Sequence, residues 1–142
     1  MKRVIFAVLL GSLGVPIAAA DRSHPDLESC IEEAGPVDLS VRDCYVELAA
    51  SEDARLNQAW RDLMTVVGGK SSAQGAALLA EQRAWLIYRD AACWHYVSST
   101  PSGTLDRLQQ QMCYSEIISQ RADYVEELAS MYLGMMRAQS ED

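Results

Sequence analysis

Residues 81–93 read EQRAWLIYRDAAC, and in this stretch Gln82, Trp85 and Arg89 recur at a spacing of three or four. This spacing places the three side chains on one face of an α-helix. A guanidinium on an inward face needs a carboxylate or carbonyl partner, because an unpaired buried charge is strongly destabilising. The stretch therefore predicts a helix that packs through a partly polar face against a second element.

We expect the partner of Arg89 to lie on the preceding helix, where Asp53 and Asn57 are polar residues at suitable positions. Arg55 lies on the same segment and is expected to face water. Arg89 is thus interpreted as a structural clamp between two helices. The alternative is an anchor for a ligand, although nothing else in the stretch resembles a pocket.

Upstream of this stretch, apolar residues recur at helical spacing from Tyr45 to Val67, with one skipped turn at Glu52. Ser40 with Asp43 resembles a capping box and predicts where this helix begins. The following Gly-Gly pair at 68–69 predicts its end. The long intervals between glycine and proline breakers suit helices better than strands.

The remaining elements follow from the same pattern. Ser71 and Gln74 have capping-box spacing and predict the start of the helix that contains residues 81–93. A third long helix is predicted from about Leu105 to Met136, and a short one over residues 26–34. The predicted fold is all-α: an antiparallel bundle of three long helices plus a possible short N-terminal helix, stapled by two disulfides.

The first twenty residues have the features of a cleaved secretory signal peptide. Lys2 and Arg3 precede an apolar run, and Pro16 precedes a small-residue end at Ala18–Ala20. The run is too short and too interrupted to cross a bilayer. We predict a signal peptide over residues 1–20 and a single helical domain over residues 21–142. The domain is expected to be periplasmic or secreted, with no membrane anchor after cleavage.

The composition is that of a globular protein and excludes several functional classes. The 142 residues are 49% hydrophobic, with 20 Asp and Glu against 12 Lys and Arg, which gives a net charge of -8. This balance argues against a disordered chain, a nucleic-acid binder and a multidomain assembly. Removing residues 1–20 removes two basic residues and no acidic one, so the exported domain carries a net charge of -10.

Export to an oxidising compartment predicts that the four cysteines form two disulfides. Cys30 and Cys44 lie on either side of the break at 35–36, and Cys93 and Cys113 lie on either side of the break near residue 102. Equal arms of a helical hairpin bring such positions opposite one another. Among three connectivities we therefore choose 30 with 44 and 93 with 113, each worth roughly 3 kcal/mol in the chain-entropy model.

No catalytic, metal or cofactor site can be specified from the sequence. His24 and His95 are the two imidazoles, and neither has an evident nucleophile or acid beside it. The cysteine spacings lack the close pairs of a zinc site. Adjacent carboxylates such as Glu126 and Glu127 point about 100° apart on a helix. We expect a protein that is not an enzyme and binds no cofactor or metal.

Taken together, these elements resemble the LprI family of small secreted bacterial lysozyme inhibitors, over about residues 30–128. The motif at the centre of the resemblance is glutamine-arginine-x-tryptophan-leucine-x-x-tyrosine-arginine-aspartate-x-x-cysteine. It implies a helical, disulfide-bonded envelope domain and, for the founding activity, inhibition of host lysozyme. The matching residues are Cys30, Cys44, Asp53, Leu56, Asn57, Gln82, Arg83, Trp85, Leu86, Tyr88, Arg89, Asp90, Cys93, Gly103, Thr104, Cys113 and Arg121.

Two functions compete at this point. One is a protein-binding inhibitor of a cationic muralytic enzyme such as lysozyme, and the other is an envelope interaction or assembly module unrelated to lysozyme. A binder of cell-wall fragments would need a pocket with exposed aromatic rings, for which Trp94 and Tyr96 are the candidates. The contact surface stays open among the acidic stretch 26–38, the loop 98–104 and the C-terminal residues 141–142.

Overall fold

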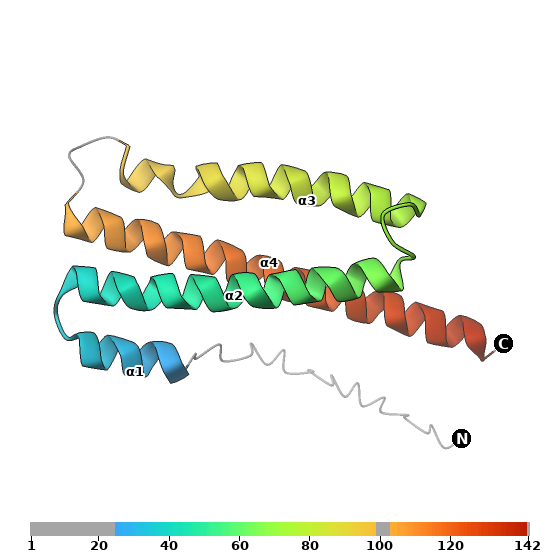
Figure 1. Cartoon of the computed structure of the whole chain (residues 1–142), viewed down its shortest axis with the longest axis horizontal. Helices are drawn as coiled ribbons and strands as arrows, with labels where there is room; N and C mark the ends of the chain where they lie inside the picture. The colour runs from blue at the N-terminus through green and yellow to red at the C-terminus, as the bar shows by residue number, and fades with distance from the viewer. Residues whose placement is uncertain (1–24, 99–102, 142) are drawn as a thin grey trace, which may run out of the picture.

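The computed structural model describes residues 25–98 and 103–141, and within these ranges it contains four α-helices, one short 3-10 helix and no strand (Figure 1). The predicted signal peptide lies outside the described residues. The all-α prediction is confirmed, including the short N-terminal helix. The elements are α1 (Pro25–Ala34), α2 (Asp38–Val66), α3 (Ala73–Ala92), η1 (Trp94–Tyr96) and α4 (Thr104–Ser140).

Consecutive helices run antiparallel, so α2 and α4 run parallel to each other (Figure 1). The backbones of α2 and α4 approach closely along their shared length, whereas α3 approaches α4 at few positions and α2 hardly at all. Small side chains such as Ala59 and Ala122 permit this close approach. The core residues of this interface are Ala49, Leu56, Ala59, Leu63, Ile118, Ala122, Val125 and Ala129.

Burial of this core supplies most of the apolar contribution to stability. Leu63 and Val125 are fully buried, and such burial contributes about 2 kcal/mol for each side chain. Within α3, all of which is described, Gly75 is the one buried residue. Leu78 and Trp85 pack against the core from this helix while remaining partly exposed. The bundle is therefore a tight α2–α4 pair with α3 set further away.

The helix starts differ from the predicted ones by one to three residues. The prediction that Ser40 caps α2 is wrong: α2 begins at Asp38, because the Val41 amide already donates to the Val37 carbonyl at 3.0 Å. The cap of α3 is Ser72, the residue after the predicted one, and its Oγ accepts the Gly75 amide at 2.9 Å. A serine caps a helix only when its own backbone is extended. The local sequence does not decide which of two adjacent serines has the extended backbone.

Both disulfides have the predicted connectivity. Cys30–Cys44 joins α1 to the first third of α2, and Cys93–Cys113 joins the end of α3 to α4. Their Cα–Cα distances are 5.8 and 5.9 Å, within the usual range for a disulfide. Two disulfides in one small domain are typical of an oxidising, extracytoplasmic compartment.

Candidate functional site

The buried arginine of the bundle is Arg121, on α4, which is 7% exposed. Its Nε and Nη2 both donate to Oε1 of Gln82, at 3.0 and 2.7 Å, and its Nη1 donates to Glu81 at 2.7 Å. The guanidinium also lies 5.5 Å from the ring centroid of Trp85 and 5.1 Å from that of Tyr124. Arg121 therefore connects α4 to the stretch of α3 that was singled out in the sequence.

Arg89 is less deeply placed than the sequence suggested. Its side chain is 20% exposed, and its strongest partner is the adjacent Asp90, at 2.7 and 2.9 Å. The expected partner Asp53 lies at 4.0 Å. The expectation for Asn57 is wrong, because the Asn57 amide donates to the Asp53 carbonyl and carboxylate, each at 2.8 Å. Arg89 therefore keeps the expected ion pair with Asp53 on α2 and adds a shorter one with Asp90 on its own helix.

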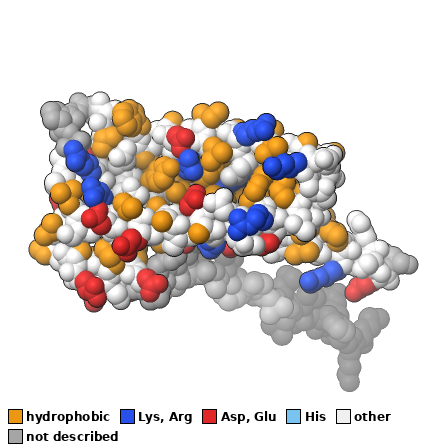
Figure 2. Space-filling view, in the orientation of Figure 1, with side chains coloured by type: hydrophobic (Ala, Val, Ile, Leu, Met, Phe, Trp, Pro, Cys, Tyr) orange, Lys and Arg blue, Asp and Glu red, His pale blue; other side chains and the backbone are white. Residues whose placement is uncertain are grey.

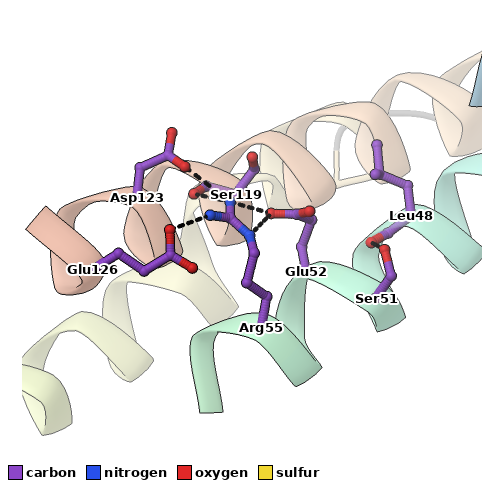
Figure 3. A network of polar contacts seen from close by, with 7 residues as sticks. All are labelled: Leu48, Ser51, Glu52, Arg55, Ser119, Asp123 and Glu126. Atoms are coloured by element: carbon purple, nitrogen blue, oxygen red, sulfur yellow. Dashed lines mark hydrogen bonds and ion pairs between the residues drawn. The ribbon is translucent and has the colours of Figure 1, made fainter. Parts of the chain in front are cut away.

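Arg55 is partly buried, with 32% of its side chain exposed, whereas the sequence-based expectation was that it faces water. It rises from α2 and points into a set of acceptors on α4 (Figure 3). Its guanidinium donates to Asp123 at 2.9 Å and to Glu126 at 2.8 Å, and reaches the Ser119 carbonyl at 3.3 Å. It also donates twice to Glu52, at 2.5 and 3.0 Å. Arg55 therefore connects α2 to α4 at the centre of the tightest helix pair.

The electrostatics of this network keep Arg55 charged. Desolvation alone would lower the pKa of Arg55, but the hydrogen bonds to Glu52 and Asp123 and the charges of Glu52 and Glu126 raise that pKa above its ordinary value. Glu52 itself is 3% exposed. The sequence did carry a signal for the Glu52–Arg55 pair, because Glu52 interrupts the apolar pattern of α2 and Arg55 follows it three positions later.

The other motif residues divide between two faces of α3. Gln82 and Trp85 point inward and are partly buried, whereas Tyr88 is 57% exposed and Asp90 is exposed. Ile87, beside Tyr88, is 74% exposed. The motif at 81–93 therefore combines an inward face that holds α3 in place with an outward face that is free to contact another molecule.

An open groove runs between α2 and α3, with a volume of about 470 Å³. The sequence-based interpretation did not expect a pocket beside this stretch. Two tryptophans face it, Trp60 from α2 and Trp85 from α3, in place of the expected Trp94 and Tyr96. The lining residues are Asp53, Leu56, Asn57, Trp60, Leu79, Gln82, Arg83, Trp85, Leu86 and Arg89.

Acidic residues are concentrated at one end of the chain. Residues 25–53 contain nine Asp and Glu against one basic residue, Arg42, whereas residues 54–142 contain ten against eight. The structure folds residues 25–53 into α1 and the first half of α2, held together by Cys30–Cys44. In Figure 2 the carboxylates gather at the lower left, over the position of α1 in Figure 1. We call this unit, residues 25–53, the acidic hairpin.

The remaining candidate features are clusters of metal-ligating side chains and the two histidines. No group of three or more His, Cys, Asp or Glu side chains in residues 25–98 and 103–141 is placed to hold a metal ion. His95 is exposed, with Nδ1 3.1 Å from the Ala92 carbonyl, and His24 lies outside the described residues. Of the helices described, none has the length and apolar character needed to span a membrane.

Comparison with known proteins gives one match. The family model described as lysozyme inhibitor LprI matches residues 30–125, a segment that includes both disulfides, the 81–93 stretch and Arg121. Searches of curated proteins and of solved structures each found no match. The matched residues make up more than half of the sequence, and the chain therefore belongs to the LprI lysozyme inhibitor family.

Proposed function

We propose that this protein is an exported inhibitor that binds a cationic lysozyme through the acidic hairpin and blocks access to the enzyme. The observation that carries the proposal is the distribution of charge: an excess of eight acidic residues lies within residues 25–53. The remaining described part of the chain is close to neutral. A basic enzyme would therefore be steered toward one end of the bundle and not to its whole surface.

The acidic hairpin also has the rigidity that an inhibitor needs. Cys30–Cys44 closes it covalently, and the Thr104 hydroxyl donates to Asp38 at 2.9 Å, which joins its turn to α4. Asp26, Glu28, Glu32 and Glu33 are exposed on α1. A preordered surface loses little conformational entropy on binding, so more of the interaction energy remains as affinity.

The proposed mechanism is occlusion without chemistry on the enzyme, by a domain that is periplasmic or secreted and is not itself an enzyme. It requires no cofactor, metal or nucleic acid. The family membership supports a protein partner. The competing proposal, an envelope interaction module unrelated to lysozyme, would use the same surface for another cationic protein.

The test measures inhibition of a c-type lysozyme on cell walls by the purified, oxidised mature domain. Glu32→Lys with Glu33→Lys reverses two charges in the acidic hairpin. Glu127→Lys with Glu141→Lys makes the same change in net charge on α4 and just after it, at exposed residues. We expect the hairpin variant to lose at least tenfold in inhibition and the control to lose much less. Inhibition should also weaken as salt shortens the Debye length below ~8 Å.

Two results would contradict the proposal. Equal losses in both variants would show that net charge acts without a defined surface. Absence of inhibition by the parent protein at micromolar concentration would favour the envelope module.

A further inference from the structure

The α2–α3 groove is held open by the way α3 is attached. At the start of α3, Gly75 packs against the turn before it, where a Cβ would lie 2.0 Å from the Gly69 carbonyl oxygen. At its end, α3 is followed at once by the Cys93–Cys113 disulfide. Between these points the large rings of Trp60 and Trp85 lie between the helices. Near the middle of α3, Arg121 bonds to Glu81 and Gln82, so α3 is fixed along its length beside the groove.

The two walls of the groove carry complementary hydrogen-bonding groups. On α2, the carboxylate of Asp53 is 46% exposed, and Oδ1 of Asn57 has no partner among the described residues. On α3, Oε1 of Gln82 accepts hydrogen bonds from Arg121 of α4, so the Gln82 amide N–H groups remain available as donors. Acceptors on one wall thus face donors on the other.

The apolar part of the groove includes one aromatic ring without a cation on it. Trp85 lies close to Arg89 and Arg121, at 5.7 and 5.5 Å from its ring centroid. No such contact is made to Trp60 by any residue in the described ranges, and its ring packs against the core while remaining partly exposed. Trp60 therefore lines the groove with an indole ring on which no cation of the described residues lies.

The charge in the groove is nearly balanced, since Asp53 lies opposite Arg89 and Arg89 is itself paired with Asp90. Arg83 adds one exposed cation at the rim. A balanced site favours a neutral ligand that can donate and accept at neighbouring atoms. Sugar hydroxyl and acetamido groups do both, and the apolar face of a pyranose ring fits a planar indole. The volume of about 470 Å³ also lies in the range of small-molecule sites.

We propose that the α2–α3 groove binds a neutral oligosaccharide built from N-acetylhexosamine units, with one ring on Trp60 and polar contacts to Asp53, Asn57 and Gln82. The site lies on the α2–α3 side of the molecule, apart from the acidic hairpin except for Asp53. The inference does not depend on the proposed function, because it concerns a ligand of this protein in the absence of any enzyme.

In the experiment, the oxidised mature domain is titrated with N,N′,N″-triacetylchitotriose. Binding is measured by calorimetry and by tryptophan fluorescence. No lysozyme is present, so a failure of inhibition and a failure of sugar binding are separate results. The test variants are Trp60→Ala and Asn57→Ala, and the control is Trp94→Ala, which removes a tryptophan that is 61% exposed outside the groove. Asn57 is exposed, so its variant keeps the test valid if Trp60→Ala does not fold.

We expect saturable binding at submillimolar sugar, weakened at least tenfold by Trp60→Ala and by Asn57→Ala and unchanged by Trp94→Ala. No binding up to millimolar sugar would overturn the proposal. Binding that is unaffected by Asn57→Ala, or is lost equally in Trp94→Ala, would also overturn it.

Discussion

Three arginines in this bundle have different roles, although each lies on a long amphipathic helix. Arg121 is enclosed between α3 and α4, and Arg55 connects α2 to α4. Arg89 lies at the edge of the groove, paired with Asp90 on its own helix and with Asp53 on α2. The depth of each side chain depends on how closely the neighbouring helix approaches. Their contributions to stability should therefore differ in ways that residue type does not indicate.

Arg55→Ala should destabilise the domain by about 3 kcal/mol, because it leaves the buried Glu52 carboxylate without its guanidinium. The control is Arg61→Ala, on the same helix, where Arg61 is exposed and bonds to Gln58. It should change stability by less than about 0.5 kcal/mol. Urea unfolding followed by fluorescence measures both. Equal effects of the two variants would show that the network of Arg55 contributes nothing to folding.

Arg121→Lys should lower stability by roughly 2 kcal/mol even though it retains the charge. A lysine cannot place two donors on Gln82 or stack a planar group on Trp85 and Tyr124. Arg107→Lys is the matched control, since Arg107 is exposed on the same helix. Thermal unfolding of both variants decides the point, and an unchanged midpoint for Arg121→Lys would show that charge alone holds α3 to α4.

At the scale of the elements, α3 is held near its middle by Arg121 and at its start by a close backbone contact. The contact of Gly75 with the Gly69 carbonyl sets one end, and the positive φ values of Gly68 and Gly69, 84° and 79°, allow the tight turn between them. Helix propensity and packing therefore make opposite predictions for alanine at residue 75.

Gly75→Ala should destabilise the domain by about 1 to 3 kcal/mol, because the added methyl group meets backbone that must move. Gly134→Ala lies in α4 with nothing within 4 Å of the added Cβ, so it should stabilise by roughly 0.5 to 1 kcal/mol through propensity alone. Thermal melts of the two variants should shift in opposite directions. An increase in both would mean that the 68–72 turn adapts without cost.

At the scale of the whole molecule, the bundle consists of one tight helix pair with two attached helices, and each attachment includes a disulfide. Replacing Cys93 and Cys113 with serine should cost about 3 kcal/mol. Because α3 has few close backbone contacts, we expect its amides to lose protection from hydrogen exchange first, while α2 and α4 remain protected. A uniform loss across all helices would show that α3 is integral to the core.

Much of this architecture could be predicted from the sequence, for a local reason. Apolar spacing and glycine breakers act within a few residues, so the helices were predicted to within about two to four residues at most ends. The cysteine pairs lie at matched distances from hairpin turns, so their connectivity was also predictable. The LprI motif was recognisable because its residues are continuous along α3.

The tertiary structure alone decided which polar side chains are enclosed and where the groove lies. Arg55 and Arg89 both occupy polar positions on amphipathic helices and both are partly buried, with 32% and 20% of the side chain exposed, whereas the sequence predicted an inward role for Arg89 alone. Burial depends on the distance to a helix that can lie seventy residues away, as for Arg55 and Glu126. The parallel α2–α4 contact and the separation of α3 set those distances, and no local pattern encodes them.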